Sequence, residues 1–132
     1  MLSDDQRTFL KEHHFAVLAT GRADGSPQVS TVMYDYDGTD LAVSIKSFTA
    51  KWKNVLRRPK VGLVINDGRK QLIVYGTAKA VEADPERMEL TRRVFRRVAG
   101  AEPGSAEQLK PLLDEQKRTA LRIVPDKAFI ND

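Results

Sequence analysis

Residues 46–60 read Lys46-Ser-Phe-Thr-Ala-Lys-Trp-Lys-Asn-Val-Leu-Arg-Arg-Pro-Lys60, and they predict a helix near the middle of the chain. Ser47 or Thr49 is the expected N-cap, because a hydroxyl there can accept a hydrogen bond from a free backbone N–H group of the first turn. The predicted helix covers residues 50–58 and ends at Pro59. Its apolar residues follow the spacing of a buried stripe: Trp52, Val55, Leu56 and Pro59. The opposite stripe holds Lys51, Asn54 and Arg58.

Lys51 is an unusual residue for its position. It falls in the first turn, where the positive end of the helix dipole disfavours a cation. A bound anion would reverse this effect, and free N–H groups, two hydroxyls and an ammonium group together suit a phosphate. The same residues also fit a basic helix face that is merely solvated, since lysine is common on protein surfaces. The local pattern leaves both interpretations open.

Apolar runs on both sides of this helix predict an antiparallel barrel. Six strands are expected, over residues 15–20, 28–36, 41–46, 61–65, 71–81 and 119–124. Short glycine turns such as Asp24-Gly25 and Asp37-Gly38 favour antiparallel neighbours. Gly76, inside the fifth strand, is expected to mark a β-bulge or a close approach of two backbones. A separate apolar pair, Phe129-Ile130, closes the chain.

Three further helices are expected outside the barrel. Ser3 begins the first with a capping box, Pro85 begins the second at its first helical position, and Ser105 caps the third. The second of these carries an arginine-rich face, which fits either a solvated surface or an extended anion groove: Arg87, Arg92, Arg93, Arg96 and Arg97. The whole pattern predicts the α+β class, with one domain over residues 1–132 that consists of a six-stranded antiparallel barrel and peripheral helices.

The composition narrows the class of protein. The chain has 132 residues, 41% of them hydrophobic and 30% charged, which is typical of a globular domain. It has no cysteine, so disulfides and cysteine-based metal sites or nucleophiles are excluded. The first residues lack the basic and apolar regions of a signal peptide, and no apolar run approaches membrane-spanning length. We therefore expect a cytoplasmic protein that does not bind a membrane.

Positive charge is concentrated around the central helix. The net charge is +4, yet residues 46–70 carry eight basic residues against Asp67 alone. A local field of this kind attracts a partner with several negative charges, such as a phosphorylated cofactor, a phosphorylated metabolite or a nucleic acid. Aromatic residues make up only 7% of the chain and do not alternate with basic residues along a strand, as base stacking requires. Nucleic acid is therefore not the expected partner.

The sequence does not contain its own catalytic machinery. It has no glycine-rich phosphate loop, no Gly-x-Ser-x-Gly elbow and no His-Glu-x-x-His motif. His13 and His14 lie at a predicted helix end without an acidic partner at ligand spacing, so we expect them to be structural. No catalytic side chain and no metal site is predicted, and an enzyme of this kind would take its chemistry from a cofactor.

An ordered set of short motifs resembles a known family. The motifs are Leu18-Ala-Thr20, Asp24-Gly-Ser-Pro27, Asp37-Gly38, Lys51-x-x-Asn54 followed by two arginines and Pro59, and Gly76-Thr-Ala78. In this order they resemble the flavin and deazaflavin oxidoreductases of the pyridoxamine-phosphate-oxidase-like, FMN-binding split-barrel fold. Relative to that family's usual pattern, Arg57 and Arg58 are shifted by one place and an acid before Pro59 is missing. The resemblance covers most of the chain and implies a homodimer with two cofactor sites at the subunit interface.

The resemblance also implies site residues and a reaction. Lys51, Ser47 and Thr49 would hold the cofactor phosphate, with Asn54 and either Arg57 or Arg58 beside them. The backbone of the second strand would line the cofactor ring through Val29, Ser30, Thr31, Val32 and Met33. No basic residue lies between Pro27 and Lys46, where true pyridoxamine-phosphate oxidases hold FMN, so the similarity is closer to the type that binds coenzyme F420.

The expected function is therefore that of an F420-dependent reductase, which transfers a hydride from the reduced deazaflavin to a small, unsaturated organic acceptor. The alternatives are an FMN-binding oxidoreductase of the same family, and a non-catalytic cofactor carrier or nucleic-acid binder.

Overall fold

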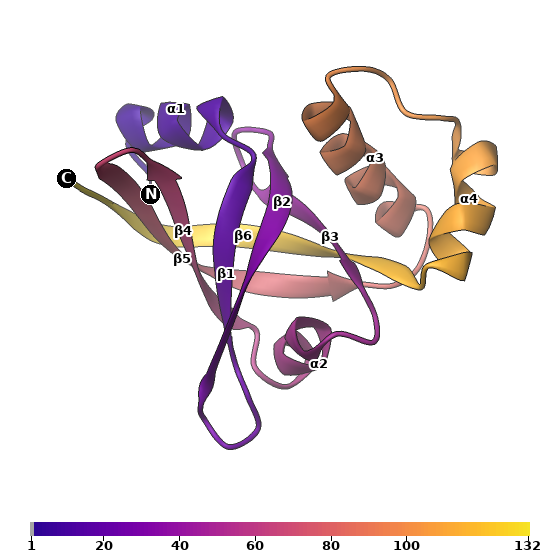
Figure 1. Cartoon of the computed structure of the whole chain (residues 1–132), viewed down its shortest axis with the longest axis horizontal. Helices are drawn as coiled ribbons and strands as arrows, with labels where there is room; N and C mark the ends of the chain where they lie inside the picture. The colour runs from indigo at the N-terminus through magenta and orange to yellow at the C-terminus, as the bar shows by residue number, and fades with distance from the viewer. Residues whose placement is uncertain (1) are drawn as a thin grey trace.

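The computed structural model describes residues 2–132, in which six antiparallel strands form a closed barrel with four helices outside it (Figure 1). The helices are α1 (Asp4–Glu12), α2 (Ala50–Arg57), α3 (Glu86–Ala99) and α4 (Ala106–Glu115). The strands are β1 (Phe15–Gly21), β2 (Pro27–Tyr36), β3 (Leu41–Lys46), β4 (Lys60–Asp67), β5 (Lys70–Val81) and β6 (Arg118–Asn131). Around the barrel they follow the order β1-β2-β3-β6-β5-β4, so the predicted fold class is confirmed.

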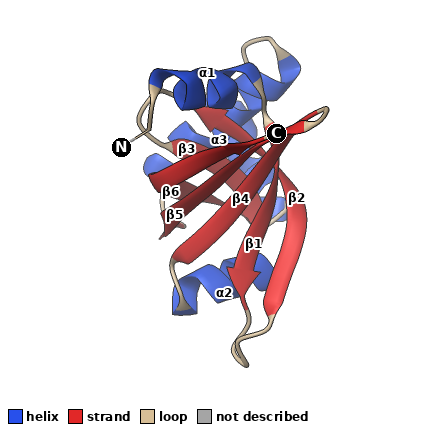
Figure 2. Ribbon diagram, turned by 90° about the vertical axis from the view of Figure 1, so that its left-hand side faces the viewer, coloured by secondary structure: helices blue, strands red, loops and turns tan. Residues whose placement is uncertain are grey.

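Alternation along the strands fills the barrel. In β1, for example, Ala16 and Leu18 are buried while Phe15 and Val17 face outward. Inward side chains from all six strands form one apolar core, to which Trp52 of α2 adds its indole ring. Figure 2 shows α1 and α2 at opposite ends of the barrel, which they cover. This burial on one face of each strand fixes the register, because a slip of one residue would expose the whole inward set.

The last strand is longer than the sequence predicts. β6 runs without interruption over 14 residues, whereas we expected a strand ending at Val124 and a separate apolar pair. Pro125 pairs with Gly76 at a shift of register. Proline has no backbone N–H group, but at this irregular position its absence does not interrupt the regular ladder of hydrogen bonds. The predicted special role of Gly76 is confirmed: a Cβ there would lie 2.7 Å from the carbonyl oxygen of Val124. The bulge therefore lets the two longest strands bend together.

The second strand is shared between two neighbours, and this division creates an opening. Residues 27–33 of β2 pair with β1, whereas only Tyr34, Asp35 and Tyr36 pair with β3. β3 pairs with β6 along its whole length, from Leu41 to Lys46, but with β2 only through Leu41, Ala42 and Val43. The edge of residues 31–33 that faces β3 is therefore left without a strand partner. A barrel that separates at this point exposes backbone hydrogen-bonding groups to whatever lies between the two strands.

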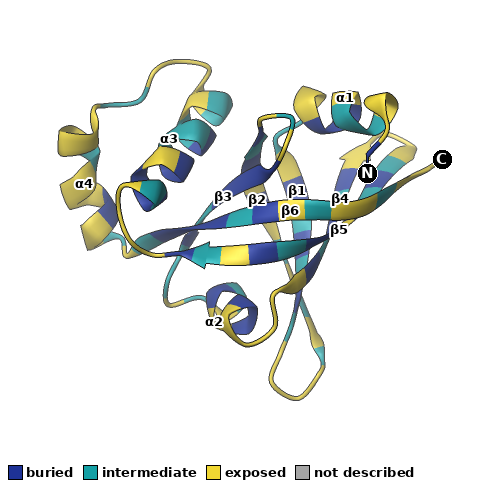
Figure 3. Ribbon diagram, turned by 180° about the vertical axis from the view of Figure 1, so that it is seen from behind, coloured by how far each residue is buried: buried dark blue, intermediate teal, exposed yellow. Residues whose placement is uncertain are grey.

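The helices α3 and α4 lie together on one side of the barrel (Figure 3). Leu90 and Val94 of α3 pack on Ala42, Val81 and Ala120 in a second, smaller apolar cluster. The arginine-rich face of α3 is largely ion-paired, which neither of our two interpretations anticipated. Arg93 lies 3.0 Å from Asp35 and 3.1 Å from Asp40 of the β2–β3 hairpin.

Arg87 shows the same departure from expectation. Its side chain is buried between Asp84 and Asp114, with N–O distances of 2.9 and 3.0 Å. Pro85 is the N-cap of α3 and not its first helical residue as predicted, and the carboxylate of Asp84 accepts from the backbone N–H of Met88. Contacts between the helix and distant parts of the chain thus decide which arginines are solvated.

Candidate functional site

A pocket of about 310 Å³ occupies the opening between β2 and β3. Its lining comes from five elements: Phe15 of β1; Thr31, Val32 and Met33 of β2; Ser44, Ile45 and Lys46 of β3; Thr49 and Lys51 at the start of α2; and Arg118 at the start of β6. One wall is the unpaired edge of β2, and the other end is the N-terminus of α2. The pocket therefore offers backbone hydrogen-bonding groups at one side and positive charge at the other.

The charges of this pocket are all of one sign. Lys46, Lys51 and Arg118 line it, and no aspartate or glutamate does. Within residues 2–132, none of these three cations lies within 4.0 Å of a carboxylate oxygen, whereas the arginines of α3 mostly have acidic partners. Three cations gathered without a counter-charge repel one another, and a bound anion would relieve that repulsion.

Burial makes the unpaired charges more costly. Desolvation lowers the pKa of Lys51, and the nearby charge of Arg118 lowers it further. Burial also lowers the pKa of Arg118. The ammonium of Lys51 donates a long hydrogen bond of 3.4 Å to Ser30, while Arg118 donates to Gln116 at 3.0 Å and to Ser44 at 3.4 Å. A negatively charged ligand would form stronger hydrogen bonds with both cations than these neutral acceptors do.

The start of α2 has no side-chain cap. Thr49 is the N-cap residue, but its hydroxyl donates to the carbonyl oxygen of Lys46 at 2.8 Å and accepts nothing from the helix. Ser47 donates its backbone N–H to Lys117 and its side chain is outside the pocket lining, so the expected hydroxyl cap is wrong for both residues. The first turn also contains no acidic residue. Free N–H groups of an uncapped helix end are suited to bind an anion.

The burial of α2 differs from the prediction at three residues. Leu56 and Pro59 were expected to be buried but are exposed, and Leu56 has 60% of its surface accessible. Asn54 was expected on the outer stripe but is buried, where its side-chain amide donates to the hydroxyl of Thr20 at 3.0 Å. Its carbonyl oxygen accepts from Arg57 at 2.6 Å. Asn54 therefore connects α2 to β1 beneath the pocket.

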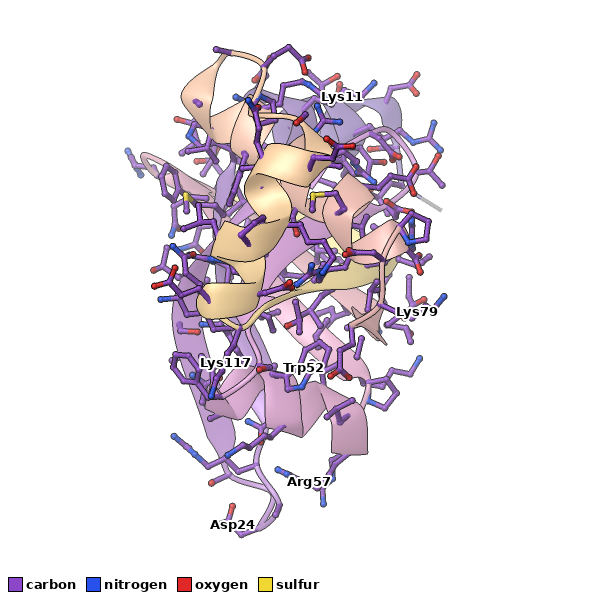
Figure 4. All side chains as sticks on the ribbon, turned by 90° about the vertical axis from the view of Figure 1, so that its right-hand side faces the viewer. Lys11, Asp24, Trp52, Arg57, Lys79 and Lys117 are labelled. Carbon is purple, nitrogen blue, oxygen red and sulfur yellow. The ribbon has the colours of Figure 1, made fainter. Side chains whose placement is uncertain are left out.

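The two consecutive arginines lie away from the pocket lining. Figure 4 shows Arg57 at the same end of the molecule as Asp24, in the turn between β1 and β2. Arg58 donates long hydrogen bonds of 3.4 and 3.5 Å to the carbonyl oxygens of Arg22 and Ala23 in that turn. Of the predicted phosphate ligands, the structure thus gathers Lys51 and Thr49 in one pocket and leaves Ser47, Asn54, Arg57 and Arg58 outside its lining.

The predicted ring-lining residues divide by their position along β2, because only the end of the strand near β3 borders the pocket. Thr31, Val32 and Met33 line the pocket, and Ser30 reaches it through its contact with Lys51. Val29 lies on the outer face of the strand, with 61% of its surface exposed.

Sequence reasoning did not identify Arg118, Lys46 or Ser44 as site residues. They reach the pocket because β3 and β6 pair in the register that sets Lys46 opposite Arg118. That pairing joins segments that are far apart in the sequence, so no local motif predicts it. The signal for Lys46 was its place at the start of the basic segment 46–70, and the signal for Arg118 was its position directly before the last predicted strand.

The tyrosines and histidines lie outside the pocket lining. Tyr34 is buried and donates from its hydroxyl to Leu10, and burial raises its pKa far above the ordinary value. Tyr36 donates to Gly38. His13 stacks on Phe9 at 4.7 Å and contacts its carbonyl oxygen at 2.7 Å, while its Nε2 lies 3.4 Å from Asp67, an acidic partner that the sequence did not indicate.

Comparison with known proteins identifies the family. The family model described as pyridoxamine 5'-phosphate oxidase matches residues 2–130. The chain belongs to this family. Its fold is similar to that of a conserved hypothetical protein, Rv2991, from Mycobacterium tuberculosis, at 25% identity and a TM-score of 0.80, over 100% of this chain and 86% of that one.

Two further solved structures share the family's barrel. An F420 reductase is 22% identical, with a TM-score of 0.71 over 97% of this chain and 98% of that one. A putative pyridoxamine 5'-phosphate oxidase from Listeria innocua is 19% identical, with a TM-score of 0.71 over 96% and 95% of the two chains.

Metal-binding clusters and membrane-spanning helices are both absent from residues 2–132. That part of the chain contains no cluster of three or more His, Asp or Glu side chains arranged to hold a metal ion. None of its helices combines the length and the apolar character needed to cross a bilayer.

Proposed function

We propose that this protein is a reductase that uses coenzyme F420 and transfers a hydride to an unsaturated organic acceptor. The observation that carries the proposal is the pocket between β2 and β3, where three cations without a carboxylate partner lie at an uncapped helix end. A phosphate fits the cations, and a flat ring fits beside the unpaired edge of β2. The likeness in fold to an F420 reductase, and membership of an oxidase family, support the same reading.

Each part of the pocket would have a separate task in holding the cofactor. Lys51 and Arg118 bind the phosphate together with the free N–H groups of α2. Lys46 adds charge at the same end, which suits further acidic groups of the cofactor. The backbone of Thr31, Val32 and Met33 would contact the ring, and Ser30 would orient Lys51. When bound, the reduced deazaflavin supplies the hydride.

The protein contributes position and electrostatics to the reaction. Bringing the two reactants within contact distance lowers the barrier by itself, by up to about 7–11 kcal/mol for ideal alignment. The acceptor also gains a proton. The pocket lining contains no His, Tyr, Asp or Glu, so we assign this proton to solvent.

Titration with both cofactors tests the proposal. Wild-type protein should bind oxidised F420 with a change in fluorescence, and Arg118→Gln should weaken that binding roughly 10- to 100-fold, as for a charge-assisted hydrogen bond. Arg22→Gln, in the exposed β1–β2 turn, is the matched control and should leave affinity within about twofold. Binding of FMN in preference to F420 would instead support the flavin enzyme, which the family name favours. Binding of neither cofactor would refute both.

We also propose that two copies of the chain form a homodimer. The outer face of the barrel carries large apolar side chains that are about half exposed, among them Phe15 of β1, Tyr75 of β5 and Phe129 of β6. Tyr75 and Phe129 contact each other edge to face, with ring centroids 6.5 Å apart. Large exposed apolar side chains that contact one another are typical of an interface.

Phe15 also lines the pocket, so a second copy on this face would lie at the pocket's mouth. Sedimentation at micromolar concentration should show a dimer, and a monomer that still binds cofactor tightly would contradict this assembly.

A further inference from the structure

We propose that the protein has a further binding site, for a short-chain monocarboxylate, in a cavity beside α1. The cavity has a volume of about 200 Å³, and its lining comes from three parts of the chain: Leu2 and Arg7 before and within α1, Tyr36, Gly38 and Thr39 at the end of β2 and in the turn that follows, and Pro125 of β6. None of these residues lines the cofactor pocket, which lies at the start of α2, whereas α1 covers the opposite end of the barrel (Figure 2). The site is therefore independent of the proposed function.

Arg7 is a cation without a counter-charge in this cavity. Its side chain is partly buried, and its Nε atom is fully buried without a hydrogen-bond acceptor. Within residues 2–132, no carboxylate oxygen lies within 4.0 Å of its guanidinium. Buried N–H groups are almost always hydrogen-bonded in folded proteins. The Nε–H group of Arg7 thus needs an acceptor that the described part of the chain does not supply.

The acidic residues of the neighbouring turn between β2 and β3 are bound to other groups. Asp37 accepts from two backbone N–H groups of its own turn, both at 2.9 Å, and lies 3.5 Å from Arg93. Asp40 pairs with Arg93 at 3.1 Å and with Arg122 at 2.5 Å. Arginines of α3 and β6 therefore hold these two carboxylates, and Arg7 can bind an anion from outside the chain.

The surroundings of Arg7 do not neutralise its charge. The hydroxyl of Tyr36 donates to the carbonyl oxygen of Gly38 at 3.0 Å. Burial raises the pKa of this hydroxyl, and the nearby charge of Arg7 opposes the rise, so the phenol stays neutral at neutral pH. Lys11 lies one turn after Arg7 on α1, and its ammonium is close to the turn: a Cβ on Gly38 would lie 3.7 Å from Nζ. A second cation beside the cavity also favours an anion as the ligand.

The shape of the cavity favours a carboxylate over a phosphate. A guanidinium presents two parallel N–H groups that match the two oxygens of a carboxylate. Leu2 and Pro125 give the cavity an apolar wall against which a short alkyl chain can be buried. A phosphate has no apolar part, and its larger charge needs more donors than one arginine provides. Butanoate meets these requirements and is the probe for the site.

An NMR titration of isotope-labelled protein at constant ionic strength tests the proposal without any cofactor. Butanoate should shift the backbone amide signals of Gly38 and Thr39 and saturate with a millimolar Kd, as expected for so small a ligand. Butanamide has nearly the same shape but no charge, so it should leave these signals unchanged. Failure of the protein to bind F420 or FMN would not alter this result.

Two pairs of variants locate the binding group. Arg7→Gln should weaken butanoate binding roughly tenfold or more, as for loss of a charge-assisted pair. Arg69→Gln, in the exposed turn between β4 and β5, removes the same charge outside the cavity and should stay within about twofold. Thr39 is exposed, so its substitution should not prevent folding. Thr39→Glu should abolish binding because the chain's own carboxylate then competes for Arg7, whereas Thr39→Gln should retain it.

Four results would overturn the site as proposed. The first is the absence of saturable shifts with butanoate, and the second is equal weakening by Arg7→Gln and Arg69→Gln, which would indicate a general attraction of anions. The third is binding by Thr39→Glu as tight as that by Thr39→Gln, which decides the matter even if Arg7→Gln does not fold. The fourth is tighter Arg7-dependent binding of inorganic phosphate than of butanoate, which would exclude a monocarboxylate as the ligand.

Discussion

The ammonium of Lys51 and the guanidinium of Arg118 face the same pocket, close enough for the charge of Arg118 to lower the pKa of Lys51. They come from α2 and β6, and no carboxylate of residues 2–132 pairs with either. Folding therefore brings two like charges together, which costs stability unless an anion joins them. Strained or repulsive arrangements of this kind are often found at binding sites.

Lys51→Ala should weaken cofactor binding by about 1.5–3 kcal/mol, because a charge-assisted hydrogen bond to a partly buried phosphate is lost. Lys60→Ala is the matched control. Lys60 belongs to the same basic segment, but its side chain is 77% exposed and pairs with Asp126, so its loss should cost far less. Fluorescence titration measures both variants. Equal losses would indicate a diffuse positive field and no specific phosphate site.

Cofactor affinity should fall with rising pH in the alkaline range. Burial, and then Arg118, lower the pKa of Lys51 in the free protein, whereas a bound phosphate stabilises its charged form and raises that pKa again. Affinity is thus constant while Lys51 is charged in both states, and it decreases as the pH rises through the lowered pKa of the free protein towards the higher pKa of the complex.

Lys51→Arg is the control for this pH dependence, since arginine stays charged throughout and should remove the alkaline loss. Titration of the ligand's own groups changes the affinity of the wild type and of the Lys51→Arg variant equally. A wild-type profile that parallels that of the arginine variant would assign the loss to other groups.

Much of the fold can be predicted from the sequence, because strands with one buried face alternate and glycine turns separate them. β3 has the predicted bounds, and the other strands except β6 differ by at most two residues at either end. β6 extends beyond the predicted end at Val124, because pairing with Gly76 at the bulge makes Pro125 tolerable within a strand.

The site was only partly predictable, for a related reason. Lys51 was identified because a cation at a helix N-terminus conflicts with the local dipole. Arg118 carries no such local conflict, and its role depends on the register between β3 and β6. Likewise, Arg93 resembles a surface arginine until the fold brings Asp35 and Asp40 to it. Local sequence patterns predict interactions between neighbouring residues, whereas these contacts form between residues that are far apart in the sequence.

Gly76→Ala should destabilise the protein by about 1–3 kcal/mol, because the new methyl group overlaps the backbone of β6. The nearest atom to that Cβ is the carbonyl oxygen of Val124 at 2.7 Å, which cannot move without distorting the bulge. Gly62→Ala on β4 is the matched control: its Cβ would find only ordinary contacts, the nearest at 3.7 Å. Urea unfolding should show little change for this control, and similar losses in the two variants would contradict the role of the bulge.

Substitution of any single histidine or tyrosine should leave turnover within about tenfold of wild type, below the 10²- to 10⁴-fold loss typical of a general acid. These five residues lie outside the lining of the cofactor pocket: His13, His14, Tyr34, Tyr36 and Tyr75. Steady-state rates of His→Gln and Tyr→Phe variants measure the effect, with cofactor affinity and unfolding as checks. A thousandfold loss in one folded, cofactor-binding variant would identify a protein acid.

The unpaired edge of β2 has a consequence for handling the protein. Strands with free backbone groups tend to recruit strands from other molecules, which is a common start of aggregation. Residues 31–33 present such an edge next to β3, and the side chains around it include exposed Met33 and Phe15. A ligand seated there would act as a cover for that edge. Protein produced in a host that lacks the ligand should therefore precipitate more readily, and supplying the ligand during expression should raise the soluble yield.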